Sequence, residues 1–131
     1  MRNIDVAQFQ ESVTRIATFG AVGVAATCTH WLVSLGLAEG VGAPAQLANV
    51  SGFAVAVLVS FFGHHHLTFR SKESARRTFP RFVVVALSGL AASAALIAGL
   101  DGLGAPTWLQ LTAAPAIIPV ATYVANRFWV F

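Results

Sequence analysis

Long apolar segments alternate with short polar breaks along the chain. Residues 16–38, 40–69, 82–100 and 102–126 contain no Asp, Glu, Lys or Arg. Each segment is long enough for a helix across about 30 Å of hydrocarbon, which takes about 20 residues. A helix is the expected form, because it satisfies its own backbone hydrogen bonds where water is absent. The pattern therefore predicts an all-α integral membrane bundle of four transmembrane helices.

The breaks between these segments organise the helices into two hairpins. Residues 39–44 and 101–106 are short turns that contain Gly and Pro, the residues that most often mark turns. We expect one membrane domain over residues 1–131. Its parts are an N-terminal cytoplasmic segment (1–14), a first hairpin (15–69), a cytoplasmic basic loop (70–80) and a second hairpin (81–131).

Composition supports a membrane location. Of the 131 residues, 56% are hydrophobic and 10% are charged, against about 25% charged in ordinary soluble domains. The net charge of +3 suggests an acidic partner. The basic residues are not interleaved with exposed aromatic or polar residues, so we expect anionic membrane lipids and no nucleic acid as partners.

The basic residues fall on one side of the predicted membrane. The eight are Arg2, Arg15, Arg70, Lys72, Arg76, Arg77, Arg81 and Arg127. The two opposite turns carry only Glu39 and Asp101. By the positive-inside rule, both termini and the central loop are cytoplasmic, in a multi-pass protein of the cytoplasmic (inner) membrane.

The first fourteen residues have no apolar run of the kind a signal peptide needs. Ile4, Phe9 and Val13 are spaced to share one side of a short helix at the membrane surface. A frayed terminus is the alternative. The single cysteine, Cys28, excludes an intrachain disulfide, and we expect it to be a small buried residue.

The two hairpins are internal repeats. Arg15 opens the first and Arg81 opens the second, which is a shift of 66 residues. The Gly-x-Gly-Ala-Pro turns begin at Gly40 and Gly102, a shift of 62, so the first helix of the second hairpin is four residues shorter. In the closing segments, the shift of 62 pairs residue 65 with 127 and residue 69 with 131. The repeats run parallel, because each enters the membrane from the cytoplasm.

Small residues recur at four-residue intervals along the first helix of each hairpin. Ala17, Ala21 and Ala25 are one such series, and Gly89 with Ser93 is another. Small residues at this spacing allow membrane helices to approach closely. We therefore expect these faces to pack against neighbouring helices.

The segments that close the hairpins carry the most specific residues. Residues 60–69 (SFFGHHHLTF) and 122–131 (TYVANRFWVF) share an aromatic residue, then His or Asn, a basic residue and a final Phe. Together with the opening Arg-x-x-x-Phe-Gly at 15–20, they resemble the GtrA-like family over residues 15–131. The chain departs from that pattern at His65, where Arg is frequent, and at Leu67, where an aromatic residue is frequent.

The resemblance implies a translocase, or flippase, for a polyprenyl-phosphate-linked monosaccharide in cell-surface polysaccharide synthesis. A separate glycosyltransferase would use the lipid-linked sugar on the outer side and is a possible partner. Four short helices are small beside such a headgroup, so we expect a homo-oligomer, in the simplest case a dimer. We expect no cofactor.

Arginines at the cytoplasmic helix ends are the candidate phosphate ligands. They are Arg15, Arg81 and Arg127, and His65 occupies the position equivalent to Arg127. Arginine binds phosphate oxygens with two parallel hydrogen bonds and stays charged near a membrane. The alternative is structural, because arginine at helix ends commonly reaches lipid headgroups and sets topology.

Four uncharged polar residues are candidates for a sugar contact or polar pathway. Asn126 and His64 lie in the closing segments, and Asn49 and His30 lie deeper in the predicted spans. A polar ring at membrane depth normally faces protein or a water-filled cavity, so a helix–helix hydrogen bond is the alternative for His30. We expect no metal site at the three consecutive histidines 64–66, because neighbours on a helix point about 100° apart.

The sequence is compatible with other functions to different degrees. A membrane scaffold that holds a glycosyltransferase fits the same helices. A small-cation or multidrug exporter would need a carboxylate within a span, and every Asp and Glu lies outside the apolar segments. An enzyme is not expected, because no nucleophile–base pair, carboxylate pair or Gly-rich phosphate loop is visible.

Overall fold

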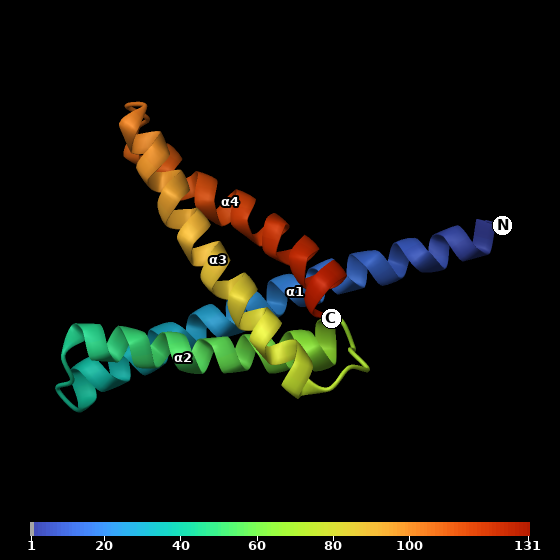
Figure 1. Ribbon diagram of the computed structural model, residues 1–131, viewed down its shortest axis with the longest axis horizontal. Helices are drawn as coiled ribbons and strands as arrows, with labels where there is room; N and C mark the ends of the chain where they lie inside the picture. Colours follow the sequence, from blue (N-terminus) through green and yellow to red (C-terminus); the bar gives the residue numbers. More distant parts are fainter. Residues whose placement is uncertain (1) are drawn as a thin grey trace. The chain divides into compact units, whose positions relative to one another are not determined.

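A computed structural model describes residues 2–131, apart from the side chains of residues 2–4, 45–46, 107, 110–111 and 114–115. Its four long helices are α1 (Arg2–Leu35), α2 (Ala45–Gly63), α3 (Ala75–Gly102) and α4 (Thr107–Ala125) (Figure 1). Among the residues described in full, three ranges are long and apolar enough to cross a membrane: Asp5–Gly40, Leu47–Thr68 and Ala75–Gly102. The fourth helix, α4, has 19 residues. The chain is an all-α, multi-pass membrane protein, as the apolar pattern predicts.

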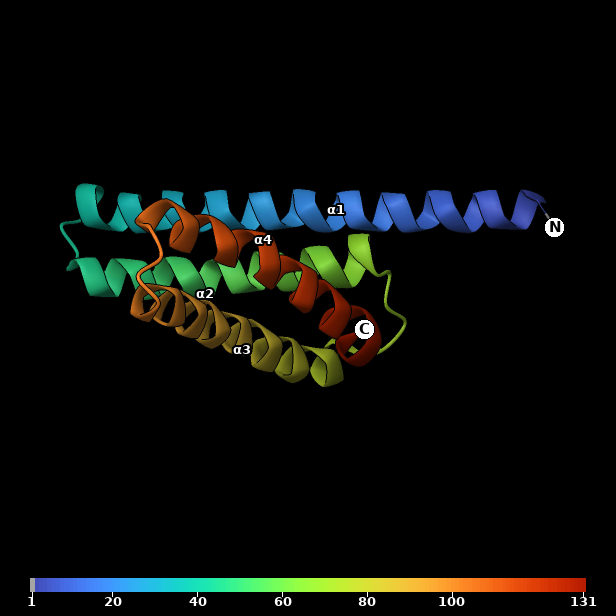
Figure 2. The same ribbon diagram turned by 90° about the horizontal axis from the view of Figure 1, so that it is seen from above.

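The helices form two compact units. The first unit comprises Met1–Lys72 and the second comprises Glu73–Phe131. Helices α1 and α2 pack side by side and antiparallel in the first unit, and α3 and α4 do so in the second (Figures 1 and 2). Each unit is therefore one helical hairpin, and the single membrane domain expected over residues 1–131 stays a prediction.

The turns at the tips of the two hairpins share a glycine in the left-handed region. Gly42 has φ +71° and Gly104 has φ +73°, in the left-handed region that glycine enters at little cost. The hydrogen bonds that close the turns differ, because the Ala43 N–H donates to the Leu37 carbonyl six residues earlier and the Ala105 N–H donates to the Leu100 carbonyl five residues earlier, each at 2.9 Å. Gly42 and Gly104 are equivalent in the 62-residue repeat, so the repeat read from the sequence is also present in the backbone.

Both hairpins close with a π-helical turn. Helix α2 continues into η2 (His64–Thr68), and α4 continues into η3 (Asn126–Val130). The Phe69 N–H donates to the His64 carbonyl and the Phe131 N–H donates to the Asn126 carbonyl, each at 2.9 Å. Each turn packs against the first helix of its own hairpin. π-helical turns are rare and frequently occur at functional sites.

The first helix is longer than the membrane segment predicted for it. Helix α1 has 34 residues, which corresponds to about 51 Å at 1.5 Å per residue. The N-terminal segment 1–14 is thus neither a separate surface helix nor frayed over residues 2–14, because α1 runs through it. The chain has no Gly or Pro before Gly20 that would interrupt the helix. A third π-helical turn, η1 (Gly36–Gly40), follows α1.

The second hairpin also begins earlier than the charges indicate. Helix α3 starts at Ala75, so Arg76 and Arg77 are helical although they fall within the expected loop 70–80. Arginine is a good helix former, so a run of positive charge does not itself end a helix. Pro80 lies inside α3 near its N-terminal end.

Glycine sets the distance between α1 and α2. A Cβ atom built on Gly52 would lie 2.6 Å from the His30 carbonyl oxygen and would overlap the Ser34 hydroxyl. A Cβ atom on Gly63 would lie 2.6 Å from Cγ1 of Val22. Both contacts are too close for any other residue, so these glycines allow the two helices to approach.

Of the predicted small-residue faces, one contacts the other helix of its hairpin and one does not. Gly89 does face α4, since a Cβ atom there would lie 3.1 Å from Cγ2 of Thr122. Ala17, Ala21 and Ala25 are exposed within the first hairpin, so the expectation that this face packs against a neighbouring helix stays a prediction. Helix α1 instead buries Val22 and Ala26. The expected burial of Cys28 is wrong, because this residue is exposed.

Candidate functional site: a polar cleft between the first helix and the closing segment of the first hairpin

A polar cleft lies where the closing segment of the first hairpin meets α1. It has a volume of about 410 Å³. Helix α1 contributes Glu11, Thr14, Arg15 and Thr18, and the closing segment contributes Leu67, Thr68, Phe69 and Arg70. We call it the Arg15 cleft. It brings one predicted phosphate ligand, Arg15, beside a second arginine that the sequence did not single out.

Arg15 is the better buried member of an ion pair. Its Nη2 atom lies 2.8 Å from Oε1 of Glu11, one helical turn away. The Arg15 side chain is 24% exposed and the Glu11 side chain is 70% exposed. Exposed ion pairs of this kind contribute little to stability. Glu11 is therefore a counterion that an anion in the cleft can replace at low cost.

Hydroxyl groups and aromatic rings complete the cleft. Thr18 Oγ1 donates to the Thr14 carbonyl at 2.7 Å, so its oxygen remains available as an acceptor. Thr68 is buried, and its Oγ1 lies 3.1 Å from Nδ1 of His64. The His64 ring stacks on Phe19, with ring centres 4.5 Å apart. This stack fixes η2 against α1 and holds Thr68 in place.

Two of the three histidines of the closing segment, His64 and His65, are buried rather than open to the cleft. His64 makes the contacts with Phe19 and Thr68, and His65 lies beside Phe61 with ring centres 5.5 Å apart. Neither histidine belongs to the lining of the Arg15 cleft. The roles predicted for them in binding phosphate and sugar stay predictions.

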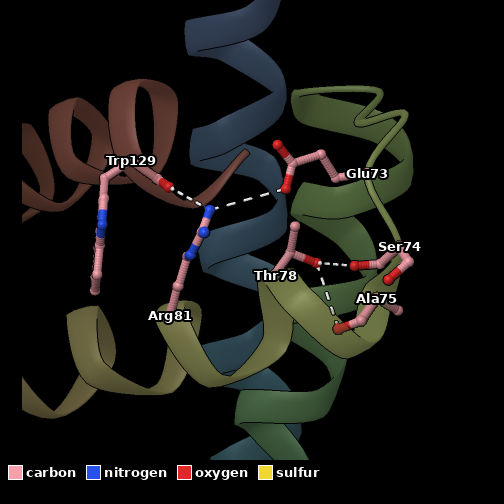
Figure 3. Close-up of polar contacts among 6 residues, drawn as sticks. All are labelled: Glu73, Ser74, Ala75, Thr78, Arg81 and Trp129. Carbon is pink, nitrogen blue, oxygen red and sulfur yellow. Dashed lines mark hydrogen bonds and ion pairs between the residues drawn. The ribbon is translucent and has the colours of Figure 1, made fainter.

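The two arginines predicted in the second hairpin have other surroundings. Arg81 Nη1 donates to the Trp129 carbonyl at 3.4 Å and lies 3.8 Å from Oε2 of Glu73 (Figure 3). The last carbonyls of a helix have no donor within it, and basic side chains commonly supply one. Arg81 thus links α3 to the end of η3. Arg127 is exposed and lies over the ring of its neighbour Phe128, 5.4 Å from the ring centre.

Asn126 is buried without a hydrogen bond to its side-chain oxygen. It is 3% exposed, and Oδ1 has no partner among the residues whose side chains are described. The equivalent residue in the first hairpin, His64, is paired with Thr68. The position equivalent to Thr68 is Val130, which has no hydroxyl. A buried polar atom with no partner in a native fold calls for an explanation, and a ligand is one.

An apolar groove of about 300 Å³ lies between α3 and α4. It is lined by Val84, Val85, Ser88, Gly89, Ala92, Ile118, Ala121, Thr122, Ala125 and Trp129. The repeat equates this surface with the α1–α2 interface. There, larger side chains fill the space: Phe19 stands where Val85 does, and Val22 stands where Ser88 does. The same interface is therefore filled in the first hairpin and open in the second.

The two deeper candidates contact one another. His30 Nε2 lies 2.9 Å from Oδ1 of Asn49, which links α1 to α2. The nearby Ser34 Oγ is buried and has no partner in the part of the chain whose side chains are described. His30 is fifteen residues along α1 from Arg15, a distance of about 22 Å. The pair therefore lies well away from the Arg15 cleft.

Some residues of the Arg15 cleft left a signal in the sequence that was missed. Glu11 with Arg15, and Thr14 with Thr18, are four residues apart and share a face of α1. Assigning residues 1–14 to a separate segment concealed this face. Arg70 left no such signal, because its place beside Arg15 depends on the geometry of η2.

Two repeated hairpins of mostly apolar helices define a small multi-pass membrane protein. The family of GtrA/DPMS transmembrane domains matches residues 18–131, and the chain belongs to this family.

Several relatives are similar over most of their length. The bactoprenol-linked glucose translocase of Salmonella phage P22 is 30% identical over 115 residues, covering 88% of this chain and 92% of the relative. The prophage bactoprenol-linked glucose translocase homolog of Escherichia coli (strain K12) is 33% identical over 116 residues with the same coverage. The translocase of Shigella phage SfX is 30% identical over 115 residues, again with that coverage.

Proposed function

We propose that the protein translocates a polyprenyl-phosphate-linked monosaccharide from one leaflet of the cytoplasmic membrane to the other. The observation that carries this proposal is the similarity to relatives named bactoprenol-linked glucose translocases along 88% of the chain. Membership of the GtrA/DPMS family supports it. Glucose is the first sugar to test, because it is the sugar in the relatives' names.

The chemistry of such a lipid fits the residues of the protein. Its long prenyl chain is soluble in the hydrocarbon core of the membrane. Its phosphate and sugar need polar partners to cross that core, since unsatisfied polar groups are costly in hydrocarbon. Arg15 offers phosphate a cation within a polar cleft. Arg81, Arg127 and His65 are further candidates for that contact. Asn126, His64, Asn49 and His30 are candidates for contacts along the path of the sugar.

The step we propose involves no covalent change. The lipid enters and leaves intact, and its net movement follows its concentration gradient. Consumption of the sugar by a glycosyltransferase on the far side would maintain that gradient. The protein in this scheme is a carrier and not an enzyme, and a homo-oligomer would enlarge the small body that four helices provide.

Reconstitution into vesicles tests the activity. Vesicles are loaded with a polyprenyl-phosphate glucose and treated with membrane-impermeant periodate, which oxidises exposed sugar. Without protein, the inner half of the lipid is protected; with protein, we expect nearly all of it to be oxidised. Phosphatidylglycerol, whose headgroup diol is also oxidised by periodate and whose inner half should stay protected, controls for general lipid scrambling. Continued protection of the inner glucose lipid would contradict the proposal, and co-purification of a glycosyltransferase would then favour a scaffold.

The proposed orientation places both termini and the linker between the units in the cytoplasm. In a Cys28→Ala background, single cysteines at Val41 and Leu103 lie in the two tip turns, and one at Lys72 lies in the linker. An impermeant maleimide should label the first two in intact cells and Lys72→Cys only after lysis. Labelling in the opposite order would reverse the orientation.

A further inference from the structure

The Arg15 cleft contains a second cation that the repeated motifs do not include. Arg70 directly follows the closing Phe69 and lines the cleft together with Arg15. We propose that Arg15 and Arg70 jointly bind the phosphate of the lipid-linked sugar. This inference rests on the proposed function and assigns the phosphate site to the first hairpin alone.

The charges of the cleft match a phosphate diester. Arg15 and Arg70 contribute two positive charges and Glu11 contributes one negative charge, so the lining has an excess of one positive charge. A prenyl phosphate joined to one sugar is a diester with a single negative charge. Its oxygens can take the place of the Glu11 carboxylate on Arg15, because that carboxylate is mostly exposed. Arginine suits this exchange, since it binds carboxylate and phosphate with the same planar geometry.

The dimensions and the other groups of the cleft suit a headgroup. A volume of about 410 Å³ lies within the range typical of small-molecule sites, roughly 300–1,000 Å³. Thr14, Thr18 and Thr68 add hydroxyl groups, and Leu67 and Phe69 add apolar surface. The threonine hydroxyl groups can hydrogen-bond a sugar, and the apolar surface can contact the start of a prenyl chain.

Arg70 occupies a conformation that normally belongs to glycine. Its φ is +45°, the only positive value at a non-glycine residue in the described chain. The Ser71 N–H donates to the His65 carbonyl at 2.9 Å, which fixes the turn around Arg70. Left-handed residues after a helix are usually glycine, because the Cβ atom of another L-residue is crowded there. Strain of this kind persists mainly at ligand sites and switches.

The second hairpin lacks the corresponding groups. The repeat equates Thr14, Thr18 and Thr68 with Pro80, Val84 and Val130. None of these three side chains can donate or accept a hydrogen bond. Arg81, the counterpart of Arg15, donates instead to the Trp129 carbonyl. Both hairpins therefore have an arginine at this position, but Arg15 pairs with Glu11 and Arg81 contacts the Trp129 carbonyl.

A binding measurement on the full chain in nanodiscs tests the inference. The probe is geranyl-phosphate glucose, which shares the phosphate diester and the sugar but is water-soluble. Arg70→Gly removes one guanidinium, and glycine readily adopts the left-handed conformation of residue 70. Arg15→Ala removes the second guanidinium. We expect each to raise Kd by roughly tenfold or more, because a charged hydrogen bond is worth about 1.5–3 kcal/mol. Glu11→Gln should lower Kd, since it removes the competing carboxylate.

Two exposed arginines outside the cleft provide matched controls. Arg76→Ala and Arg77→Ala remove the same charge from α3 and should change Kd less than twofold. Equal losses in controls and cleft variants would overturn the inference, since the effect would then be one of net charge. An unchanged Kd in both Arg15→Ala and Arg70→Gly would also overturn it.

Competition distinguishes the possible sources of phosphate. Unlabelled geranyl-phosphate glucose should displace the probe, whereas soluble phosphatidylglycerol and inorganic phosphate should not. Equal displacement by phosphatidylglycerol would make the cleft a general headgroup site, and displacement by inorganic phosphate would make it a free-phosphate site; either result overturns the assignment. The vesicle assay tests transport independently of this binding measurement. Transport by the unaltered protein with normal probe binding in both variants would reject the site and leave the function standing.

Discussion

His64 and Asn126 hold the same place in the two hairpins. Each is the first residue of a π-helical turn, each is buried, and each backbone carbonyl accepts a 2.9 Å hydrogen bond from the phenylalanine five residues later. Their side chains differ in hydrogen bonding. His64 is paired with Thr68, whereas Oδ1 of Asn126 has no partner among the described side chains.

This difference predicts opposite effects of two leucine substitutions on stability. Asn126→Leu removes an unpaired buried acceptor and should leave the free energy of unfolding unchanged or raise it. His64→Leu breaks the pair with Thr68 and the stack on Phe19, and should lower it by about 1–3 kcal/mol. Thermal unfolding in detergent measures both. If Asn126→Leu also reduces transport in vesicles, its amide serves the substrate. A loss of stability as large as that of His64→Leu would instead mean that the amide is paired in the folded protein.

The close contact at Gly52 predicts a strict requirement for glycine. Gly52→Ala places a methyl group against the His30 carbonyl, which belongs to the backbone and cannot rotate away. We expect it to lower the stability of the first hairpin by about 1–3 kcal/mol, as overpacking does. Gly23→Ala is the control, because a Cβ atom there meets nothing within 4 Å. Equal melting temperatures for the two variants would show that α1 and α2 are further apart than described.

The hydrogen bond between His30 and Asn49 predicts a measurable coupling. In a double-mutant cycle with alanine at both positions, we expect a coupling of about 0.6 kcal/mol, with an upper limit near 1.7 kcal/mol, as for other hydrogen bonds between membrane helices. A parallel cycle between Asn49 and the exposed His66 should give none. If the first cycle also gave none, the two side chains would act independently, and a role in the sugar pathway would gain support.

The contact between Arg81 and Trp129 predicts a structural role for this arginine. Arg81→Ala should loosen η3 and speed amide hydrogen exchange in residues 126–131, with a loss of about 0.5–1.5 kcal/mol. Glu73→Gln should have a smaller effect, because the ion pair at 3.8 Å is half exposed. Binding of geranyl-phosphate glucose should be unchanged in both variants. Weaker binding in Arg81→Ala with unchanged exchange would assign Arg81 to the phosphate instead.

The features that the sequence predicted well are those controlled by local composition. Uncharged segments of sufficient length become helices in a membrane. The Gly-x-Gly-Ala-Pro turns each place a glycine, Gly42 or Gly104, in the left-handed region, which glycine enters at little cost. The repeat was visible for the same reason, since equal residues at equal spacing fold alike.

The features that the sequence did not reveal depend on the approach of two helices. His30 and Asn49 were each recognised as polar residues at depth, but their pairing depends on the antiparallel register of α1 and α2. Arg70 was one of several basic residues after the closing Phe69, and only the left-handed turn beyond η2 brings it to the cleft. The exposure of Ala17 and its neighbours likewise follows from which side of α1 meets α2.

The uninterrupted length of α1 fixes the rotational phase between its N-terminal end and the cleft. Residues upstream of Arg15 continue the same helix, so Glu11 and Thr14 stand at set angles to Arg15. A single residue inserted between Thr14 and Arg15 would turn everything before it by about 100°. It would carry Glu11 away from Arg15 and swing the exposed Val6 and Phe9 to another side. Whatever contacts the start of this helix is thereby held in a defined angular relation to the arginine cleft.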